Sequence, residues 1–442
     1  MATVTRASKK EIFGWAMFDF ANSSYTTVIV TVVFSVIFPR LIVGDAPEYR
    51  TGNLLWSLSL SISYLLVLLS APVFGAIMDY TAAKKRFLFA ATILTVLTTS
   101  SLYFVTPGAV YLGMFLIVLS NIGFSLSESF VSSFLTNLGP PEDLGKISGY
   151  AWGFGYFGGL FSTALVMFGL GALTMENFHN LRFVGPITGA FFLIAAIPTF
   201  LWVREPGTPR TLPAGRTYVG VGMERIRKTL VDIKDYRDLA TLLASFFFAY
   251  AGLSIVISFA FIYGDQVIKW APLTQMLMFV ITQFTAAGGA FFFGLLQDRW
   301  GAKRTFMLTL VLWVAAVTLI YGVDDVTAFM NGMLGTSFET QKMFLVVGSI
   351  AGLGLGATQS ACRAMVGLFA PESKSGEFFG LWGLTGRLAA IFGLMGLGFL
   401  QASFGLKNAV LLCSVFFVIA IFVVLFVNEK RGRAAALEHE GE

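Results

Sequence analysis

Long apolar segments follow one another along almost the whole chain, separated by short connections that carry charge, Gly or Pro. A helix needs about 20 predominantly apolar residues to cross the hydrocarbon core of a bilayer. Twelve such spans are predicted, at 12–38, 54–77, 87–105, 109–135, 150–173, 183–203, 239–263, 273–296, 305–323, 343–369, 377–402 and 407–427. Only 12% of the 442 residues are charged, against roughly 25% in a soluble domain. The pattern predicts an all-α integral membrane protein.

Lys and Arg are distributed unevenly between the two sets of connections that alternate along the chain. One set, which includes both ends of the chain, holds most of the 30 basic residues. The other set holds only Arg40, Arg50, Arg182, Lys269, Lys342 and Lys407. In membrane proteins the cytoplasmic connections carry the excess of basic residues. Both termini are therefore predicted to lie in the cytoplasm.

The longest polar connection, at 204–238, separates the sixth and seventh spans. It begins with the loop-like REPGTPRTLPAGR and continues as GMERIRKTLVDIKDY. In the second part Met223, Ile226, Leu230 and Ile233 recur at helical spacing among charged residues, which predicts an amphipathic helix on the cytoplasmic surface. The predicted organisation is an N-terminal six-helix bundle at 1–203, this linker, and a C-terminal six-helix bundle with a tail at 239–442.

The two predicted bundles repeat each other in sequence. In each, an Asp follows a Gly by four residues, and a basic pair follows the same Gly by nine and ten residues. The two sets are Gly75, Asp79, Lys84 and Lys85, and Gly294, Asp298, Lys303 and Arg304. A second repeat relates Pro141, Glu142, Trp152 and Gly153 to Pro371, Glu372, Trp382 and Gly383. Such internal repetition is typical of a transporter that binds its solute between two pseudo-symmetric halves.

The stretch GLLQDRWGAKR, which starts at Gly294 and includes Arg299 and Gly301, resembles the signature loop of the major facilitator superfamily. The loop after Gly75 is a weaker copy, with Ala82 where the family prefers Gly. The resemblance implies that these loops hold one end of a central cavity shut, with each Asp near the N-terminus of the next structural element. The gating residues are then Gly75, Asp79, Lys84, Lys85, Gly294, Asp298, Arg299, Gly301, Lys303 and Arg304. The alternative is that the basic residues only set the orientation of the chain.

Three further stretches resemble the vacuole effluxer-like branch of that superfamily, which includes the autophagy-related amino-acid effluxer of the fungal vacuole. They are WAMFDFANSSY from Trp15, GFSLSES from Gly123 and SGYAWGFGYFGG from Ser148. The resemblance covers essentially the whole chain and implies a secondary transporter of amino acids. The connections are short, which suits a bacterial member in the inner membrane.

Four ionisable side chains fall inside predicted spans: Asp19, Glu128, Arg363 and Arg387. Such residues are costly in a bilayer and usually face a cavity or a partner. At the helical rise of about 1.5 Å per residue, the first three lie about 10 Å from the cytoplasmic face, at one level. In the resembled fold the first, fourth, seventh and tenth spans line the cavity, so these three residues are expected to meet there.

The expected chemistry is that of a zwitterion and a proton. A carboxylate in a low-dielectric cavity takes up a proton more readily, so Asp19 and Glu128 suit a proton or an amino group. Arg363 is always charged and suits a carboxylate. Asn22, Ser23 and Tyr25 complete the predicted substrate and proton site, and the polar run that ends at Ser24 is expected to let the first span bend.

Structural explanations of the same charges stay open. Asp19, Glu128 and Arg363 are also compatible with an ion-pair network that only fixes the packing of the spans. For Arg387 a structural role is the preferred interpretation, because its span usually packs outside the first ring around the cavity. It would then reach the membrane interface or pair with Glu377.

The sequence contains no HExxH, GxGD, GxSxG or Walker motif, and its two histidines lie outside the predicted spans. These features disfavour an enzyme, a metal or cofactor site and coupling to ATP. The prediction is a monomeric, proton-coupled transporter of amino acids or related zwitterions that works by alternating access, with solute, protons and lipid as partners and no nucleic acid. The alternatives are an efflux pump for drug-like compounds and a transport-inactive membrane scaffold.

Overall fold

The structure is a computed structural model that describes residues 6–44, 50–140, 143–171, 173–208, 215–231 and 236–438. The described residues form helices and no strands. The N-terminal half contains α1 (Lys9–Ser24), η1 (Tyr25–Val32), α2 (Phe34–Ile37), η2 (Phe38–Val43), α3 (Arg50–Thr81), α4 (Lys84–Ser100), η3 (Ser101–Phe104), α5 (Val110–Ser132), η4 (Leu135–Asn137), α6 (Leu144–Leu170), α7 (Phe178–Leu181) and α8 (Val184–Trp202).

The connecting helix and the C-terminal half follow. They contain α9 (Tyr218–Val231), α10 (Arg237–Tyr263), η6 (Gly264–Ile268), α11 (Pro272–Trp300), α12 (Ala302–Tyr321), α13 (Val323–Leu334), α14 (Thr340–Phe369), η7 (Glu372–Lys374), α15 (Ser375–Val424) and α16 (Glu429–Glu438). Here η1, η2 and η6 are π-helical, and η3, η4 and η7 are 3-10 turns.

Among the described residues, eleven helices are long and apolar enough to cross a membrane, and α3 adds a twelfth. The helix α3 bends by 41° between Leu58–Ala71 and Val73–Thr81. Pro72 separates the two segments, and a proline inside a helix removes a hydrogen bond and kinks the chain. The turn η7 and the element α15 together hold two spans, Glu372–Leu397 and Lys407–Val424. The predicted class, an all-α membrane protein with twelve spans, is confirmed.

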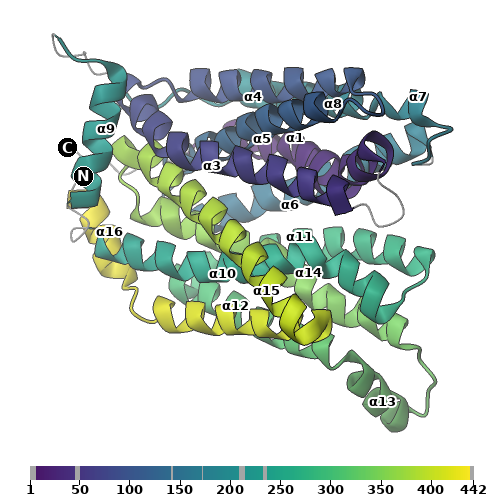
Figure 1. Cartoon of the computed structure of the whole chain (residues 1–442). Coiled ribbons are helices and arrows are strands. Elements are labelled where there is room, and N and C mark those ends of the chain that lie inside the picture. Colours follow the sequence, from purple (N-terminus) through teal and green to yellow (C-terminus); the bar gives the residue numbers. More distant parts are fainter. Residues whose placement is uncertain are drawn as a thin grey trace.

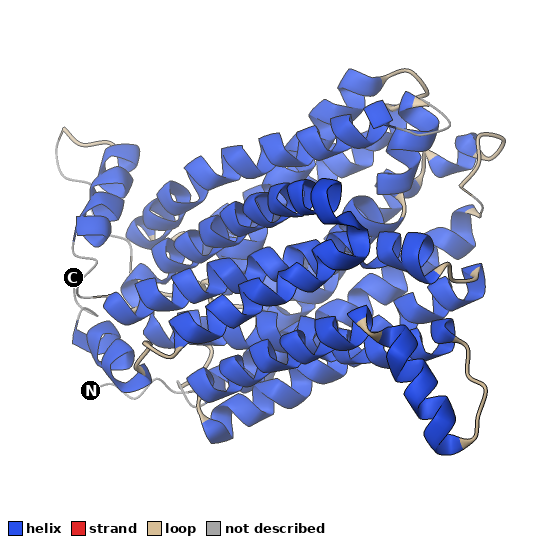
Figure 2. Ribbon diagram, turned by 60° about the horizontal axis from the view of Figure 1, so that its bottom comes forward, coloured by secondary structure: helices blue, strands red, loops and turns tan. Residues whose placement is uncertain are grey.

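The helices of the two halves form two layers that face each other, with α1 to α8 above and α10 to α15 below in Figure 1. Both termini lie at one end of the molecule, together with α9 and α16 (Figures 1 and 2). We call this the terminal end, and the opposite end, where α7 and α13 lie, the far end. The boundaries predicted at 203 and 239 between bundles and linker stay a prediction.

The predicted amphipathic helix of the connection is present as α9, which starts at Tyr218 and packs against α3. Met223 on this helix is exposed. The side chains of Ile226 and Leu230, and the whole of Ile233, lie outside the described residues. Two short helices outside the spans were not predicted: α13, which projects at the far end, and α16, which folds back across the terminal end (Figure 1).

Candidate site between the two halves

The first span changes its helical geometry directly after its polar run. The Ser23 hydroxyl donates to the carbonyl of Asp19 at 2.8 Å, and the Ser24 hydroxyl donates to that of Ala21 at 2.7 Å. Hydroxyls that bond back to helix carbonyls compete with the helix ladder and often bend it. The α-helix ends at Ser24, and the π-helical turn η1 follows. The irregular first span expected from the sequence is thus observed, and Asp19 lies just before it.

Asp19 forms an ion pair with Arg363 that joins α1 to α14. The Arg363 Nη1 donates to Asp19 Oδ2 at 2.6 Å, and the Arg363 side chain is only 2% exposed. The other guanidinium nitrogens donate to Ser148 on α6, Nε to Oγ and Nη2 to the carbonyl, both at 3.0 Å. The guanidinium also lies over the rings of Trp15 and Trp152, 4.8 and 5.2 Å from their centroids. All three guanidinium nitrogens of Arg363 therefore donate to the N-terminal half, although Arg363 itself lies on α14 of the C-terminal half.

Glu128 forms a second ion pair between the halves, joining α5 to α15. The Arg387 Nη2 donates to Glu128 Oε2 at 2.6 Å. The Arg387 guanidinium also lies 5.6 Å from the ring of Tyr64 on α3. Its Nε is buried and has no hydrogen-bond partner among the described residues. This pair is less completely bonded than the first.

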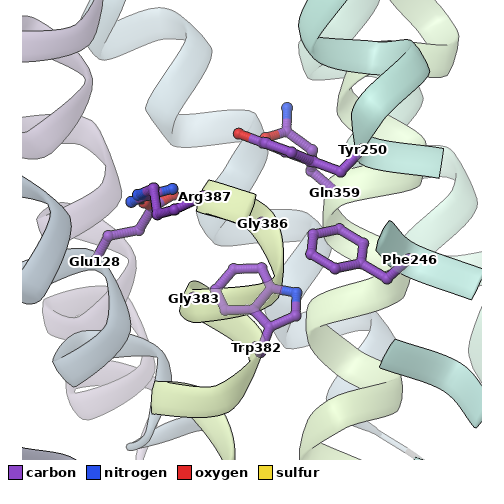
Figure 3. A pocket seen from close by; sticks show the side chains of 8 residues that line it. All are labelled: Glu128, Phe246, Tyr250, Gln359, Trp382, Gly383, Gly386 and Arg387. Atoms are coloured by element: carbon purple, nitrogen blue, oxygen red, sulfur yellow. The ribbon is translucent and has the colours of Figure 1, made fainter. Parts of the chain in front are cut away.

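A small cavity lies beside the second pair, near the middle of the molecule. It is lined by Glu128, Phe246, Tyr250, Gln359, Trp382, Gly383, Gly386 and Arg387, which come from α5, α10, α14 and α15. Figure 3 shows Glu128 and Arg387 together on one side, with Tyr250 and Gln359 across from them. The cavity volume open to water is about 10 Å³, which is enough for about one water molecule. The cavity is too small for an organic solute in this conformation.

Each signature Asp caps the start of a helix in the opposite half, at the terminal end. Asp79 accepts the backbone N–H of Glu377, at the start of α15, at 3.0 Å. Asp298 accepts the N–H groups of Gly145 and Lys146, at the start of α6, both at 3.0 Å. A carboxylate is stabilised by the unpaired N–H groups and dipole of a helix N-terminus. In each case the capped helix belongs to the other half, while Asp79 also lies 3.7 Å from Lys84 at the start of α4, the next element along the chain.

Glycines bring the halves into backbone contact at the same end. A Cβ on Gly75 would lie 2.2 Å from the carbonyl oxygen of Gly376, and one on Gly294 would lie 2.6 Å from that of Gly145. Contacts this close exclude any other residue without movement of the helices. The terminal end is therefore closed by two equivalent contacts, α3 with α15 and α11 with α6.

The sequence matches the family model of the Atg22-like vacuole effluxers over residues 55–437. The chain belongs to this family. Its relatives include the uncharacterized MFS-type transporter YxiO of Bacillus subtilis, 24% identical over 95% of each chain. They also include autophagy-related protein 22-1 of Emericella nidulans, 24% identical over 66% of this chain and 51% of the fungal protein. The chain thus spans about half the length of that fungal relative.

Solved structures of major facilitator transporters share the fold. The proton:xylose symporter XylE matches with a TM-score of 0.72 and 13% identity, covering 98% of both chains. The human organic anion transporter MFSD10 matches with a TM-score of 0.71 and 14% identity, covering 94% of this chain and 99% of that one. This Atg22-like protein is accordingly a multi-pass membrane protein with a transporter fold.

The other predicted substrate residues of this Atg22-like protein lie away from the cavity. Asn22 is buried, and its Oδ1 has no hydrogen-bond partner among the described residues. Ser23 is held by its bond to Asp19. The hydroxyl of Tyr25 lies 2.8 Å from that of Ser120, and its ring stacks on Phe124. Asp19 and Arg363 meet as expected, but they do not line the cavity.

The predicted gating residues divide into those that bridge the halves and those that do not. Lys84 is buried and donates to Ser375 Oγ of the other half at 2.5 Å. Lys85 donates to the carbonyl of Phe200, and Lys303 donates to those of Leu425 and Val427, so each stabilises its own half. Arg299 and Arg304 are exposed, and Gly301 adopts a φ of 93°.

The sequence interpretation missed part of the cavity wall and misassigned one pair. Arg387 was expected to reach the interface or pair with Glu377, and this was wrong, because Glu128 lies opposite it. Gln359, Tyr250 and Phe246 were not singled out. Gln359 offered a signal, since it is an uncharged polar residue one helical turn before Arg363. The two aromatic residues offered none, because Phe is abundant throughout the spans.

Proposed function

We propose that this protein is a secondary active transporter that moves amino acids or related zwitterions by alternating access, coupled to protons. The observation that carries the proposal is the presence of two carboxylate–guanidinium pairs, one buried and one partly buried, each joining one half to the other. Buried charges are costly unless they are paired. Pairs that bridge two moving halves offer groups of both signs to a zwitterion when the halves separate.

The closed terminal end supports a two-sided cycle. Contacts of Asp79 and Asp298 hold this end shut, and they must break before solute passes it. In the proposed cycle the far end and the terminal end open in turn, and the solute is bound beside the central pairs between the two openings. The proposed setting is the bacterial inner membrane, with both termini in the cytoplasm and the protein acting as a monomer.

An efflux pump for drug-like compounds is the second candidate, favoured by the aromatic wall of Phe246, Tyr250 and Trp382. A cationic drug, however, would meet the guanidinium of Arg387 in the same wall. A transport-inactive scaffold gains nothing from two charge pairs between its halves.

The test is uptake of radiolabelled amino acids into proteoliposomes, with and without an imposed proton gradient. We expect Asp19→Asn and Glu128→Gln each to lower gradient-driven uptake by about a hundredfold or more, since a positioned proton-transfer group usually contributes at least that much. Asp325→Asn, at an exposed position of α13, is the matched control and should keep the wild-type rate. Undiminished gradient-driven uptake in both variants would refute the role of these two carboxylates. Wild-type uptake that does not respond to the gradient would refute proton coupling, and absence of saturable uptake in the wild type would refute transport of amino acids.

A further inference from the structure

The two ion pairs between the halves differ in how fully their guanidinium groups are used. On Arg363, the Nε, Nη1 and Nη2 nitrogens all donate to protein acceptors. On Arg387, Nη2 donates to Glu128, while the buried Nε has no hydrogen-bond partner among the described residues. A guanidinium carries five N–H donors in a planar fork that fits a carboxylate with two parallel bonds. Every guanidinium nitrogen of Arg363 therefore has an acceptor, whereas the Nε of Arg387 has none among the described residues.

The unused donor belongs to the side chain that lines the central cavity. Arg387 shares the cavity wall with Gln359, Tyr250 and Trp382, whereas Arg363 is absent from it. Figure 3 shows the amide of Gln359 and the hydroxyl of Tyr250 across the cavity from the ion pair. The indole of Trp382, which lines the same wall, has the thiol of Cys362 as its hydrogen-bonding neighbour. Buried polar groups are normally satisfied, so the unsatisfied Nε of Arg387 beside this cavity indicates a ligand with acceptor atoms.

A glycine one residue before Arg387 keeps this space free. A Cβ on Gly386 would lie 3.5 and 3.8 Å from atoms of the Phe246 ring and 3.9 Å from the Tyr250 ring. These are ordinary contact distances, so the backbone does not require glycine here. The missing side chain instead leaves room against the aromatic wall.

We propose that Arg387 is the residue that binds the anionic group of the solute. On this proposal, which rests on the proposed function, a solute carboxylate replaces the Glu128 carboxylate on the guanidinium fork. The exchange keeps Arg387 paired throughout, which matters because an unpaired buried charge is strongly destabilising. Glu128, once released, binds the ammonium group of the same solute or a proton. No covalent bond forms or breaks.

The exchange predicts an order among solutes that share one side chain. A zwitterion satisfies both Arg387 and the released Glu128. A carboxylate without an amine satisfies Arg387 but leaves Glu128 to take up a proton, so it binds better at acid pH. A cation without a carboxylate leaves Arg387 unpaired and binds least.

The test uses three probes with the leucine side chain: L-leucine, 4-methylpentanoate and L-leucinamide. Their affinities for the full-length purified protein are measured by titration calorimetry. Wild type should bind L-leucine best and L-leucinamide worst. Glu128→Gln removes the competing carboxylate, so it should bind 4-methylpentanoate at least about tenfold more tightly than wild type, as expected for a freed hydrogen bond to a charged group.

This gain in affinity should disappear in the double variant Glu128→Gln with Arg387→Gln. The double variant removes both charges of the pair, so it leaves no unpaired charge in the site and can be used even if the single variant Arg387→Gln fails to fold. Lys407→Gln, at the far end, is the control that should match wild type. A merely structural Arg387 predicts no gain in Glu128→Gln, and that result overturns the proposal, as does L-leucinamide binding as tightly as L-leucine. A wild type that neither binds nor transports any probe overturns the amino-acid proposal as well. Leucine transport that is unaffected in the double variant overturns only the role of Arg387.

Discussion

Two charge pairs join the halves, Asp19 with Arg363 and Glu128 with Arg387. Asp19, Glu128 and Arg363 stand out because ionisable residues in spans are costly, and helix rise places them at one level. Which carboxylate meets which guanidinium depends on how helices far apart in sequence rotate toward each other. Asp19 and Arg363 are 344 residues apart, and Glu128 and Arg387 are 259 apart. Local sequence patterns do not determine which residues pair.

Ala82 offers a residue-scale test of the weaker signature loop. Its φ of 46° lies in the left-handed region, where the Cβ of an L-residue costs about 1–2 kcal/mol. The equivalent loop has Gly301 at a φ of 93°. We expect Ala82→Gly to stabilise the protein by about 1 kcal/mol, seen as a higher melting temperature in detergent. Gly301→Ala should have the opposite effect, and a lower melting temperature for Ala82→Gly would contradict this explanation.

At the scale of elements, the spans could be read from the sequence because each needs a long apolar run. The π-helical turn after Ser24 and the bend at Pro72 also follow from local residues. The helices α13 and α16 could not be predicted in this way, since short helices outside the membrane have no long apolar run. The last of these, α16, is held by Asp238 on α10, which accepts from Arg431 Nε at 2.6 Å, Arg431 Nη2 at 2.9 Å and the N–H of Asn428 at 2.7 Å.

The attachment of α16 predicts how the C-terminal helix responds to a single substitution. Asp238→Asn keeps the size of the side chain but removes the charge that binds Arg431, at a cost of about 1–3 kcal/mol. We expect trypsin to cleave after Lys430, Arg431 or Arg433 several times faster in this variant. The control is Asp325→Asn on α13, in which trypsin should cleave α16 at the wild-type rate. Equal cleavage rates in both variants would show that Asp238 does not hold the helix.

At the scale of the whole molecule, the internal repeat was the most informative signal. It predicted matching loops, and the structure places Asp79 and Asp298 in equivalent caps at one end. The repeat could not show that each cap reaches into the opposite half, because that depends on how the halves face each other. It also could not show that the central cavity is nearly closed while the terminal end is shut.

Alternating access requires the two halves to separate at the terminal end during each transport cycle. Asn137 and Glu372 face each other across this end, with Asn137 Nδ2 donating to Glu372 Oε2 at 3.2 Å. Both native cysteines are buried. In the double variant Asn137→Cys with Glu372→Cys, a short, reducible bifunctional reagent should therefore react with the two introduced thiols. The deciding measurement is amino-acid uptake into proteoliposomes before cross-linking, after it, and after reduction. The account predicts that the cross-link stops uptake and that reduction restores it. Uptake at the full rate by fully cross-linked protein would contradict it.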